Sequence, residues 1–316
     1  MPQSILLGVS SCLLGNPVRY DGGHQRDPYI IQTLGQYVRY LPVCPEVECG
    51  MPIPRESLRL VGPPENPRLL TRKTGEDHTE AMQAWARKRL DALEKENLCG
   101  FIFKGGSPSS GMERVKVYNE KGHMVTKTGV GIFAKAFMER FPLIPVEEDG
   151  RLHDPVLREN FIIRIFALTR WREARKAMKL GDLVAFHTDN KLLILAHSTE
   201  HYREMGRLVA KGKAMEAKDL FREYETLLLQ ALSRKSTARK NTNVLQHMLG
   251  YFKQILPDAE RKELLDLITR YHKGQLPLIV PMTLFGHHVR KYDVAYLARQ
   301  TYMNPHPAEL ALRNHV

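Results

Sequence analysis

The sequence is poor in cysteine and contains no long apolar run. Four cysteines in 316 residues are too few for a disulfide scaffold at this size, which favours a reducing cytoplasm and directs attention to metal or thiolate chemistry. No apolar stretch approaches the roughly 20 residues of a membrane-spanning helix, so no membrane partner is expected. With 43% hydrophobic and 26% charged residues and no internal repeat or low-complexity tract, the composition is that of a globular protein.

The first half of the chain is nearly neutral in net charge, and the second half is strongly basic. The formal net charge is +12, yet residues 1–150 hold 19 Lys and Arg against 18 Asp and Glu, and residues 151–316 hold 28 against 17. Such an asymmetry is typical of a module that binds a polyanion, and RNA or DNA is favoured over a membrane because no basic amphipathic anchor is evident. A solvated helical surface is the alternative interpretation.

The first 150 residues alternate short apolar runs with helical patterns, which predicts an α/β domain with a Rossmann-like, mostly parallel sheet. The segments 5–9, 41–43, 99–103 and 143–146 are expected to be strands, and the segments 27–40, 76–97 and 128–141 are expected to be helices. Between them, residues 51–71 are so rich in proline that we expect no core segment but a loop that either faces the substrate or is mobile.

The charged segment 147–150, which ends in glycine, is predicted to separate two domains, residues 1–150 and 151–316. Beyond it the pattern is helical almost throughout, beginning with the start signal Asp154-Pro155. The sequence therefore predicts an all-α second domain.

Three of the predicted strands end in polar loops. The run 5–9 leads into Ser10-Ser11-Cys12, the run 41–43 leads into Cys44-Pro45-Glu46, and the run 99–103 leads into Lys104 and the turn 105–111. If these strands are parallel neighbours, their loops meet at the sheet edge where open α/β folds place their ligands. Taken alone, Cys12 and Cys44 are candidate metal ligands or nucleophiles, and buried structural cysteine is the alternative for each.

Several longer motifs carry a family resemblance. CLLGNPVRYDGG, VCPEV, PRES and SPSSGMERVKVY resemble the thiouracil desulfidase (TudS) family, and LAHSTEHYREMGRLVA, NVLQHMLGYFK, PLIVPMTLFGHHV and YMNPHPAELALRN resemble the YbgA-like helical domain. A fusion of the two resembles the tRNA 2-thiouridine desulfidases called RudS. The resemblance covers nearly the whole chain.

The resemblance implies a [4Fe-4S] cluster held by three cysteines, with one iron left open. Cys12 and Cys44 match the first two ligands, but Ser110 stands where the third cysteine belongs. A neutral hydroxyl is a poor ligand for soft iron. We favour a substituted third ligand and a weakly held or absent cluster over the alternative that Cys49 or Cys99 is recruited.

The resemblance also implies roles for the catalytic residues. Glu46 matches the carboxylate that activates water and manages protons, and Ser107 matches the residue that orients substrate or water. Asp21 is a further candidate. The structural alternatives are a turn or cap role for Ser107 and Asp21 and a surface position for Glu46.

Basic residues supply the candidate RNA contacts. Lys104 lies at a strand end facing the predicted site, and Arg234, Lys235, Arg239 and Lys240 form the densest basic run of the chain, between two predicted helices. An exposed helix connection is the alternative for this run. His197, His201 and Tyr202, with His247 and Tyr251, fit polar core positions or RNA contacts better than a metal site, because the glutamate of a zinc-protease motif is missing.

The predicted function is removal of sulfur from 2-thiouridine in tRNA to give uridine, with tRNA as the partner, a [4Fe-4S] cluster as the cofactor and no obligate protein partner. Two rivals stay open. One is a metal-free sulfur transferase in which Cys12 or Cys44 is the nucleophile. The other is a non-catalytic tRNA-binding protein whose cluster site has degenerated at Ser110.

Overall fold

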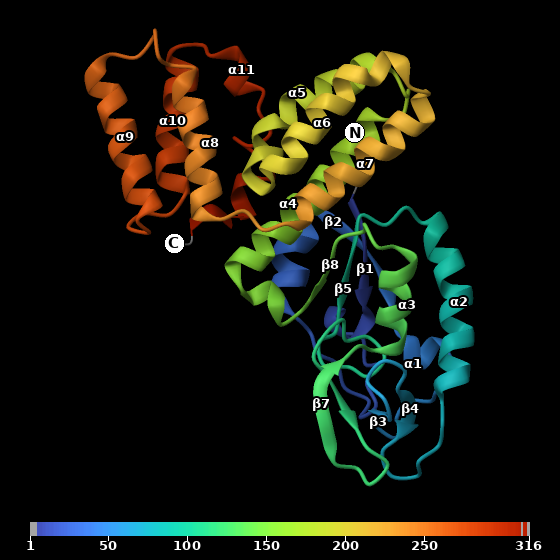
Figure 1. Ribbon diagram of the computed structural model, residues 1–316. Helices are drawn as coiled ribbons and strands as arrows, with labels where there is room; N and C mark the ends of the chain where they lie inside the picture. Colours follow the sequence, from blue (N-terminus) through green and yellow to red (C-terminus); the bar gives the residue numbers. More distant parts are fainter. Residues whose placement is uncertain (1–4, 311, 315–316) are drawn as a thin grey trace. The chain divides into compact units, whose positions relative to one another are not determined.

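The chain divides into two compact units, Met1–Asp154 and Pro155–Val316. We describe them from a computed structural model that covers residues 5–310 and 312–314 (Figure 1). The division falls a few residues after the predicted boundary at residue 150. The segment 147–150 itself belongs to the first unit, because Glu147 and Glu148 lie in a strand and are buried.

A four-stranded parallel sheet forms the centre of the first unit. Its order is β2 (Val38–Val43), β1 (Ile5–Ser10), β5 (Gly100–Phe103) and β8 (Val146–Glu148). Ser10 pairs with Val43, and Val9 pairs with Ile102. The carboxyl ends of β1, β2 and β5 therefore meet at one edge, which confirms the predicted α/β class and the parallel sheet.

Two helices cover one face of this sheet (Figure 1). They are α2 (Thr79–Lys95) and α3 (Ile132–Arg140), and the core between them and β5 holds Phe101, Phe103, Phe133 and Phe137. The rings of Phe101 and Phe103 stack with centroids 4.3 Å apart. α2 has Glu80 in its first turn and Lys95 in its last, as the helix dipole favours.

The proline-rich segment 51–71 is not the loop that we expected. It supplies β3 (Leu58–Val61) and β4 (Arg68–Thr71), two strands of a second sheet with the order β4, β3, β6 (Val115–Tyr118), β7 (Met124–Gly129). Leu60 and Leu69 are fully buried against Met82 and Val117. The prolines lie outside the paired residues, so overall proline content concealed two short strands.

Other element boundaries also differ from the prediction. The helix expected over 27–40 is only a π-helical turn (Tyr29–Thr33) and a 3-10 turn (Leu34–Gln36) before β2 begins. The helix expected over 128–141 begins at Ile132, because residues up to Gly129 form β7. Shorter helices are η1 (Ser11–Leu14), α1 (Pro45–Glu48) and η4 (Arg151–His153).

The second unit is helical, as predicted, and every strand of the described residues ends by Glu148. Its longer helices are α4 (Pro155–Ala174), α5 (Leu180–His197), α6 (Thr199–Lys211), α7 (Ala217–Ser233), α8 (Ala238–Gly250), α9 (Asp258–His272) and α10 (Ile279–Lys291). Shorter ones are η5 (Gly212–Ala214), α11 (Ala295–Ala298), η6 (Ala308–Leu310) and η7 (Leu312–Asn314). Trp171 of α4 packs on Tyr224 of α7.

None of the helices in residues 5–310 and 312–314 combines the length and the apolar character that a membrane crossing requires.

Candidate active site

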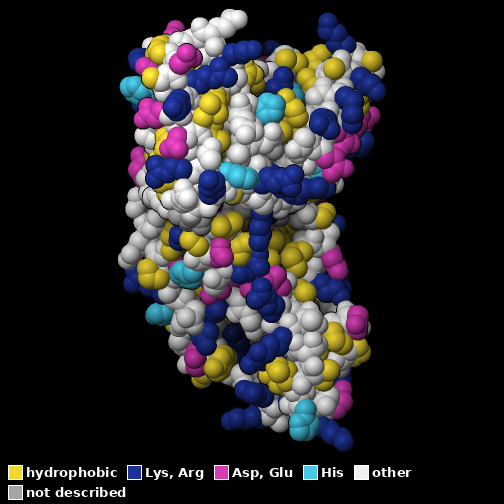
Figure 2. All heavy atoms as spheres, turned by 60° about the vertical axis from the view of Figure 1, so that its left-hand side comes forward, with side chains coloured by type: hydrophobic (Ala, Val, Ile, Leu, Met, Phe, Trp, Pro, Cys, Tyr) yellow, Lys and Arg dark blue, Asp and Glu magenta, His cyan; other side chains and the backbone are white. Residues whose placement is uncertain are grey.

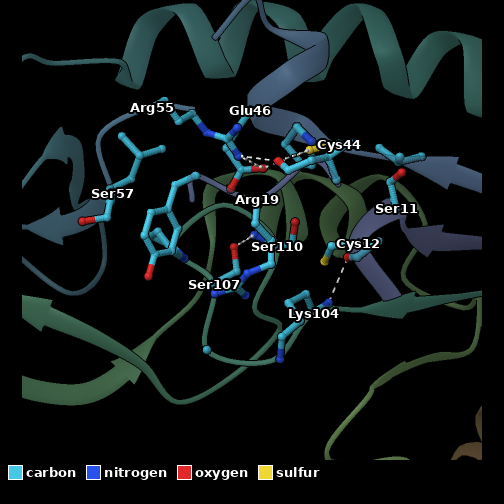
Figure 3. Close-up of a pocket in the computed structure, with 18 of the residues that line it drawn as sticks. Ser11, Cys12, Arg19, Cys44, Glu46, Arg55, Ser57, Lys104, Ser107 and Ser110 are labelled. Atoms are coloured by element: carbon cyan, nitrogen blue, oxygen red, sulfur yellow. Dashed lines mark hydrogen bonds and ion pairs between the residues drawn. The ribbon is translucent and has the colours of Figure 1, made fainter. Parts of the chain in front are cut away.

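Three loops meet at the carboxyl edge of the parallel sheet and enclose a pocket of about 260 Å³. Cys12 lies on η1, directly after β1, and Cys44 lies between β2 and α1. Ser107 and Ser110 come from the loop that follows β5. Figure 3 shows these side chains around one hollow, as the spacing of the strand ends predicts.

Both pocket thiols favour their protonated form. Burial raises the pKa of Cys12 to about 11, with a further contribution from the charge of Glu46. Burial followed by the same carboxylate raises the pKa of Cys44 to about 12. A nucleophilic cysteine needs the opposite shift, so the metal-free pocket is poorly suited to thiolate attack.

Glu46 connects the cysteine loop to the serine loop. Its Oε1 accepts a hydrogen bond of 2.5 Å from the hydroxyl of Ser109, and its Oε2 lies 3.6 Å from the sulfur of Cys44. Arg55, whose guanidinium also donates to the Val18 carbonyl, lies 4.0 Å from the same oxygen. The carboxylate is thus fixed at the pocket wall by a neutral donor and flanked by a cation.

Ser109 is a site residue that sequence reasoning missed. It is fully buried, and its hydroxyl lies 3.0 Å from that of Ser107. Because the single hydroxyl hydrogen of Ser109 is donated to Glu46, the hydrogen between the two serines comes from Ser107. A signal was present, since Ser109 stands beside Ser110 in the same polar turn.

The serine loop is held from two sides. The hydroxyl of Ser107 accepts from the backbone N–H of Ser110 at 3.1 Å, a turn role that coexists with its place at the pocket. The carbonyls of Pro108 and Ser109 accept the N–H groups of Ile132 and Phe133, the first residues of α3. A Cβ at Gly131 would lie 2.5 Å from the backbone of Ser109, so only glycine permits this approach.

Lys104 lines the pocket, but its charge is already paired. Its Nζ lies 2.7 Å from the carboxylate of Asp149, which also accepts from the backbone N–H of Gly105. Its own backbone N–H donates to the hydroxyl of Ser10. These bonds tie β5, β8 and β1 together at the site, so the structure favours a bracing role for Lys104 over the predicted phosphate contact.

Three other candidates lie outside the pocket. The exposed carboxylate of Asp21 accepts from the N–H of Gly23 at 3.0 Å, a turn role instead of a catalytic one. Cys49 points its thiol at the carbonyl of Glu46. Cys99 precedes β5, and its backbone N–H donates to the carbonyl of Leu6. It therefore lies at the opposite end of the strand from the pocket loops. The strand direction argues against recruitment of Cys99, and Cys49 lies beside the Glu46 carbonyl without lining the pocket.

The donor set is one thiol short of a cluster held by three cysteines. Cys12, Cys44 and the hydroxyl of Ser110 line the pocket, and Ser110 is buried. Across the described part of the chain, no group of three or more His, Cys, Asp or Glu side chains is arranged to hold a metal ion. The pocket lies where such a cofactor would bind, but its residues supply only two of the three thiols that the cofactor requires.

The segment that forms the pocket is similar to known proteins. The family model described as 2-thiouracil desulfurase matches residues 7–149, which contain the whole pocket. YbbK of Bacillus subtilis (strain 168) is 31% identical over 127 residues, covering 39% of this chain and 83% of YbbK. The chain belongs to the 2-thiouracil desulfurase family. A solved structure described as the [4Fe-4S]-dependent thiouracil desulfidase TudS is 29% identical and covers 48% of this chain and 95% of its own, with a TM-score of 0.40.

This member of the 2-thiouracil desulfurase family carries a second module. The model described as a protein of unknown function (DUF1722) matches residues 191–307. YbgA of Escherichia coli (strain K12) is 33% identical over 158 residues, covering 49% of this chain and 94% of YbgA. Both parts of the predicted resemblance, desulfidase-like and YbgA-like, are confirmed.

The basic run of the helical unit has mixed roles. Lys240 donates from Nζ to the carbonyls of His197 and Lys235, and Arg234 lies 3.3 Å from Glu200. Lys235 and Arg239 are exposed, which leaves them as the best placed of the predicted RNA contacts. On the face that Figure 2 shows, lysine and arginine are scattered among other side chains.

The described histidines of this unit form no group that could hold a metal ion. His197 and His201 are buried, and they bond respectively to the carbonyl of Arg234 and the hydroxyl of Ser198. Of the two interpretations that the sequence favoured, polar core is the one these bonds support. Tyr251 stacks on Tyr296 at a centroid distance of 4.7 Å and is 45% exposed.

Proposed function

We propose that the chain has the active site of a tRNA 2-thiouridine desulfidase whose third cluster ligand is replaced by Ser110. The observation that carries this proposal is the pocket itself. Cys12 follows β1, Cys44 and Glu46 follow β2, and all three line a part-buried space within the segment that matches the 2-thiouracil desulfurase family. The overall reaction replaces the C2 sulfur of the base with the oxygen of water and releases hydrogen sulfide, with no change of oxidation state.

In this proposal Glu46 takes a proton from the attacking water and returns it to the departing sulfur. Ser109 fixes the carboxylate by its 2.5 Å hydrogen bond, and the Arg55 guanidinium lies 4.0 Å from its other oxygen. Ser107 and Ser110 border the space that a planar base would enter. No step is assigned to a cluster, because the residues present supply only two thiols.

The substrate is proposed to be a base in tRNA because the helical unit is strongly basic. The excess of 28 Lys and Arg over 17 Asp and Glu in residues 151–316 favours binding to a polyanion. A thiouridine must leave its stack to enter a part-buried pocket of this kind. The rival proposal, a non-catalytic tRNA-binding protein, is favoured by the single observation of Ser110 at the ligand position.

One substitution separates these proposals. The native chain and the Ser110→Cys variant are incubated anaerobically with iron and sulfide, and the visible absorption of a bound cluster is recorded. Sulfide release is then measured with thiolated tRNA and with free 2-thiouracil. We expect a stable cluster and sulfide release in Ser110→Cys, and a labile cluster with little release in the native chain.

The alternatives give other patterns. Cluster binding by the native chain that disappears in Cys49→Ser would identify Cys49 as a recruited ligand. A Ser110→Cys variant that binds no cluster and releases no sulfide would overturn the desulfidase proposal. In that case tRNA binding by the native chain, measured as a function of salt concentration, would support the non-catalytic alternative.

A further inference from the structure

The helical unit contains a cavity of about 290 Å³ that the desulfidase proposal does not use. It lies between the start of α4, the end of α5, the start of α8 and the end of α9, and its apolar walls include Val156, Ile163, Leu276 and Leu278. Sites for drug-sized ligands run from about 300 to 1,000 Å³, so this one suits a single ring system. We call it the α4–α8 cavity.

His197 presents a hydrogen-bond acceptor to the α4–α8 cavity. The residue is 1% exposed, and its Nδ1 lies 2.7 Å from the carbonyl of Arg234. A carbonyl only accepts, so Nδ1 carries the hydrogen and Nε2 carries a lone pair. Burial lowers the pKa of His197 to about 4, which keeps the ring neutral. His197 lines the cavity, and the only hydrogen bond of its ring among the described residues is the one from Nδ1, so Nε2 can accept from a bound group.

Two hydroxyl groups add donors to the same cavity. The side-chain amide nitrogen of Asn241 donates to Ser236 and to Tyr271, each at 3.1 Å, and its oxygen accepts from Tyr302 at 3.0 Å. Because Ser236 and Tyr271 both accept from the amide, each keeps its own hydroxyl hydrogen for another partner. Both residues line the cavity.

One acceptor and two donors complement the edge of a pyrimidine. The edge of uracil offers one N–H donor between two acceptor oxygens, and that of cytosine offers an amino donor with two acceptors. Guanine offers the reverse balance, two donors and one acceptor. Neutral hydrogen-bonding groups on apolar walls are also the environment in which a protein reads an unstacked base.

The rim of the cavity is suited to a phosphate. Lys235 lines the opening, and the first backbone N–H groups of the 13-residue helix α8 lie beside it at Ala238 and Arg239. Helix N-termini with a nearby lysine favour anions. The acidic residue of the cavity, Glu159, lies 3.4 Å from Arg313, so its charge is compensated.

We propose that the α4–α8 cavity binds a pyrimidine nucleotide, with the base inside against His197, Ser236 and Tyr271 and the phosphate at Lys235 and the start of α8. In the tRNA-bound protein this is a second nucleotide site, separate from the reaction pocket. The nucleotide arrives either free or within an RNA strand, and the chemistry of recognition is the same.

The test is a calorimetric titration of the full native chain with UMP, uridine, CMP and AMP. UMP contains no sulfur, so the result is independent of whether the chain desulfurates anything. We expect saturable binding of one UMP or CMP, and AMP weaker by about tenfold, because its two-ring base is larger than the single ring that the cavity suits. A hexamer of uridylate that displaces UMP identifies RNA as the source, whereas failure to displace it identifies the free nucleotide.

Variants locate the site. Tyr271→Phe should weaken UMP binding by about tenfold, and Ala238→Leu, which adds bulk at an exposed position of the opening, should abolish it. Lys235→Ala should weaken UMP but not uridine. The matched control is Lys218→Ala, which removes an exposed lysine at the start of α7. It should change the affinity for neither UMP nor uridine.

Thermal melts establish that each variant is folded. The proposal is overturned if neither UMP nor the hexamer binds the native chain, or if both still bind Ala238→Leu with native affinity.

Discussion

Two cavities of similar volume, about 260 Å³ in the α/β unit and about 290 Å³ in the helical unit, are built in different ways. The first is bordered by charges that face each other, such as Glu46 with Arg55 and Lys104 with Asp149. The second has one compensated carboxylate and leaves neutral groups unpaired. Paired charges around thiols suit proton transfer and soft ligands, while unpaired neutral groups suit the recognition of an uncharged edge.

The largest effect is expected from Glu46→Gln in the Ser110→Cys background. This isosteric change removes the proton acceptor, so sulfide release should fall by roughly 10²–10⁴-fold, while UMP binding at the α4–α8 cavity stays unchanged. The matched control is Glu56→Gln, a carboxylate of the same pocket whose oxygens accept from Thr74. Equal losses in the two variants would show that Glu46 has no special role.

The next largest effect is expected from Gly131→Ala, on the free energy of unfolding. Its Cβ would lie 2.5 Å from the backbone of Ser109, and overpacking of this kind costs roughly 1–3 kcal/mol of unfolding free energy. The control is Gly150→Ala, where a Cβ would meet nothing within 4 Å and the change should stay within about 0.5 kcal/mol. Urea titration measures both, and equal midpoints would contradict the close approach.

Ser109→Ala should lower kcat by about tenfold while leaving KM unchanged, because the lost hydrogen bond positions Glu46 and does not bind substrate. The measurement again uses the Ser110→Cys background, with the exposed Ser233→Ala as control. A rise in KM at constant kcat would instead place Ser109 among the groups that hold the substrate.

The smallest effect is expected from Asp21→Asn. The carboxylate is exposed and caps a turn outside the pocket, so sulfide release should change by less than about twofold. A loss of sulfide release as large as that of Glu46→Gln would instead make Asp21 a catalytic residue. It would mean that the loop that holds Asp21 closes over the substrate.

The strand ends were predictable because apolar runs that stop at polar loops have a clear pattern, and parallel pairing then brought Cys12, Cys44 and Ser107 together. The strands β3 and β4 were not predictable, because a four-residue strand between prolines is too short to show an alternating apolar pattern. Ser109 was missed because two adjacent serines look alike in sequence, and only the turn decides which one faces Glu46. The α4–α8 cavity joins residues from 156 to 278, a separation that local patterns do not bridge.

The hydrogen bonds from the first turn of α3 to the carbonyls of Pro108 and Ser109 hold the backbone of the serine loop in place. They anchor the serine loop to a helix that is itself fixed by Phe133 and Phe137 in the aromatic core. The loop therefore loses its conformational freedom when the protein folds, before any ligand arrives. A thiol introduced at position 110 would start from a preorganised backbone, so the Ser110→Cys substitution requires no reordering of the loop.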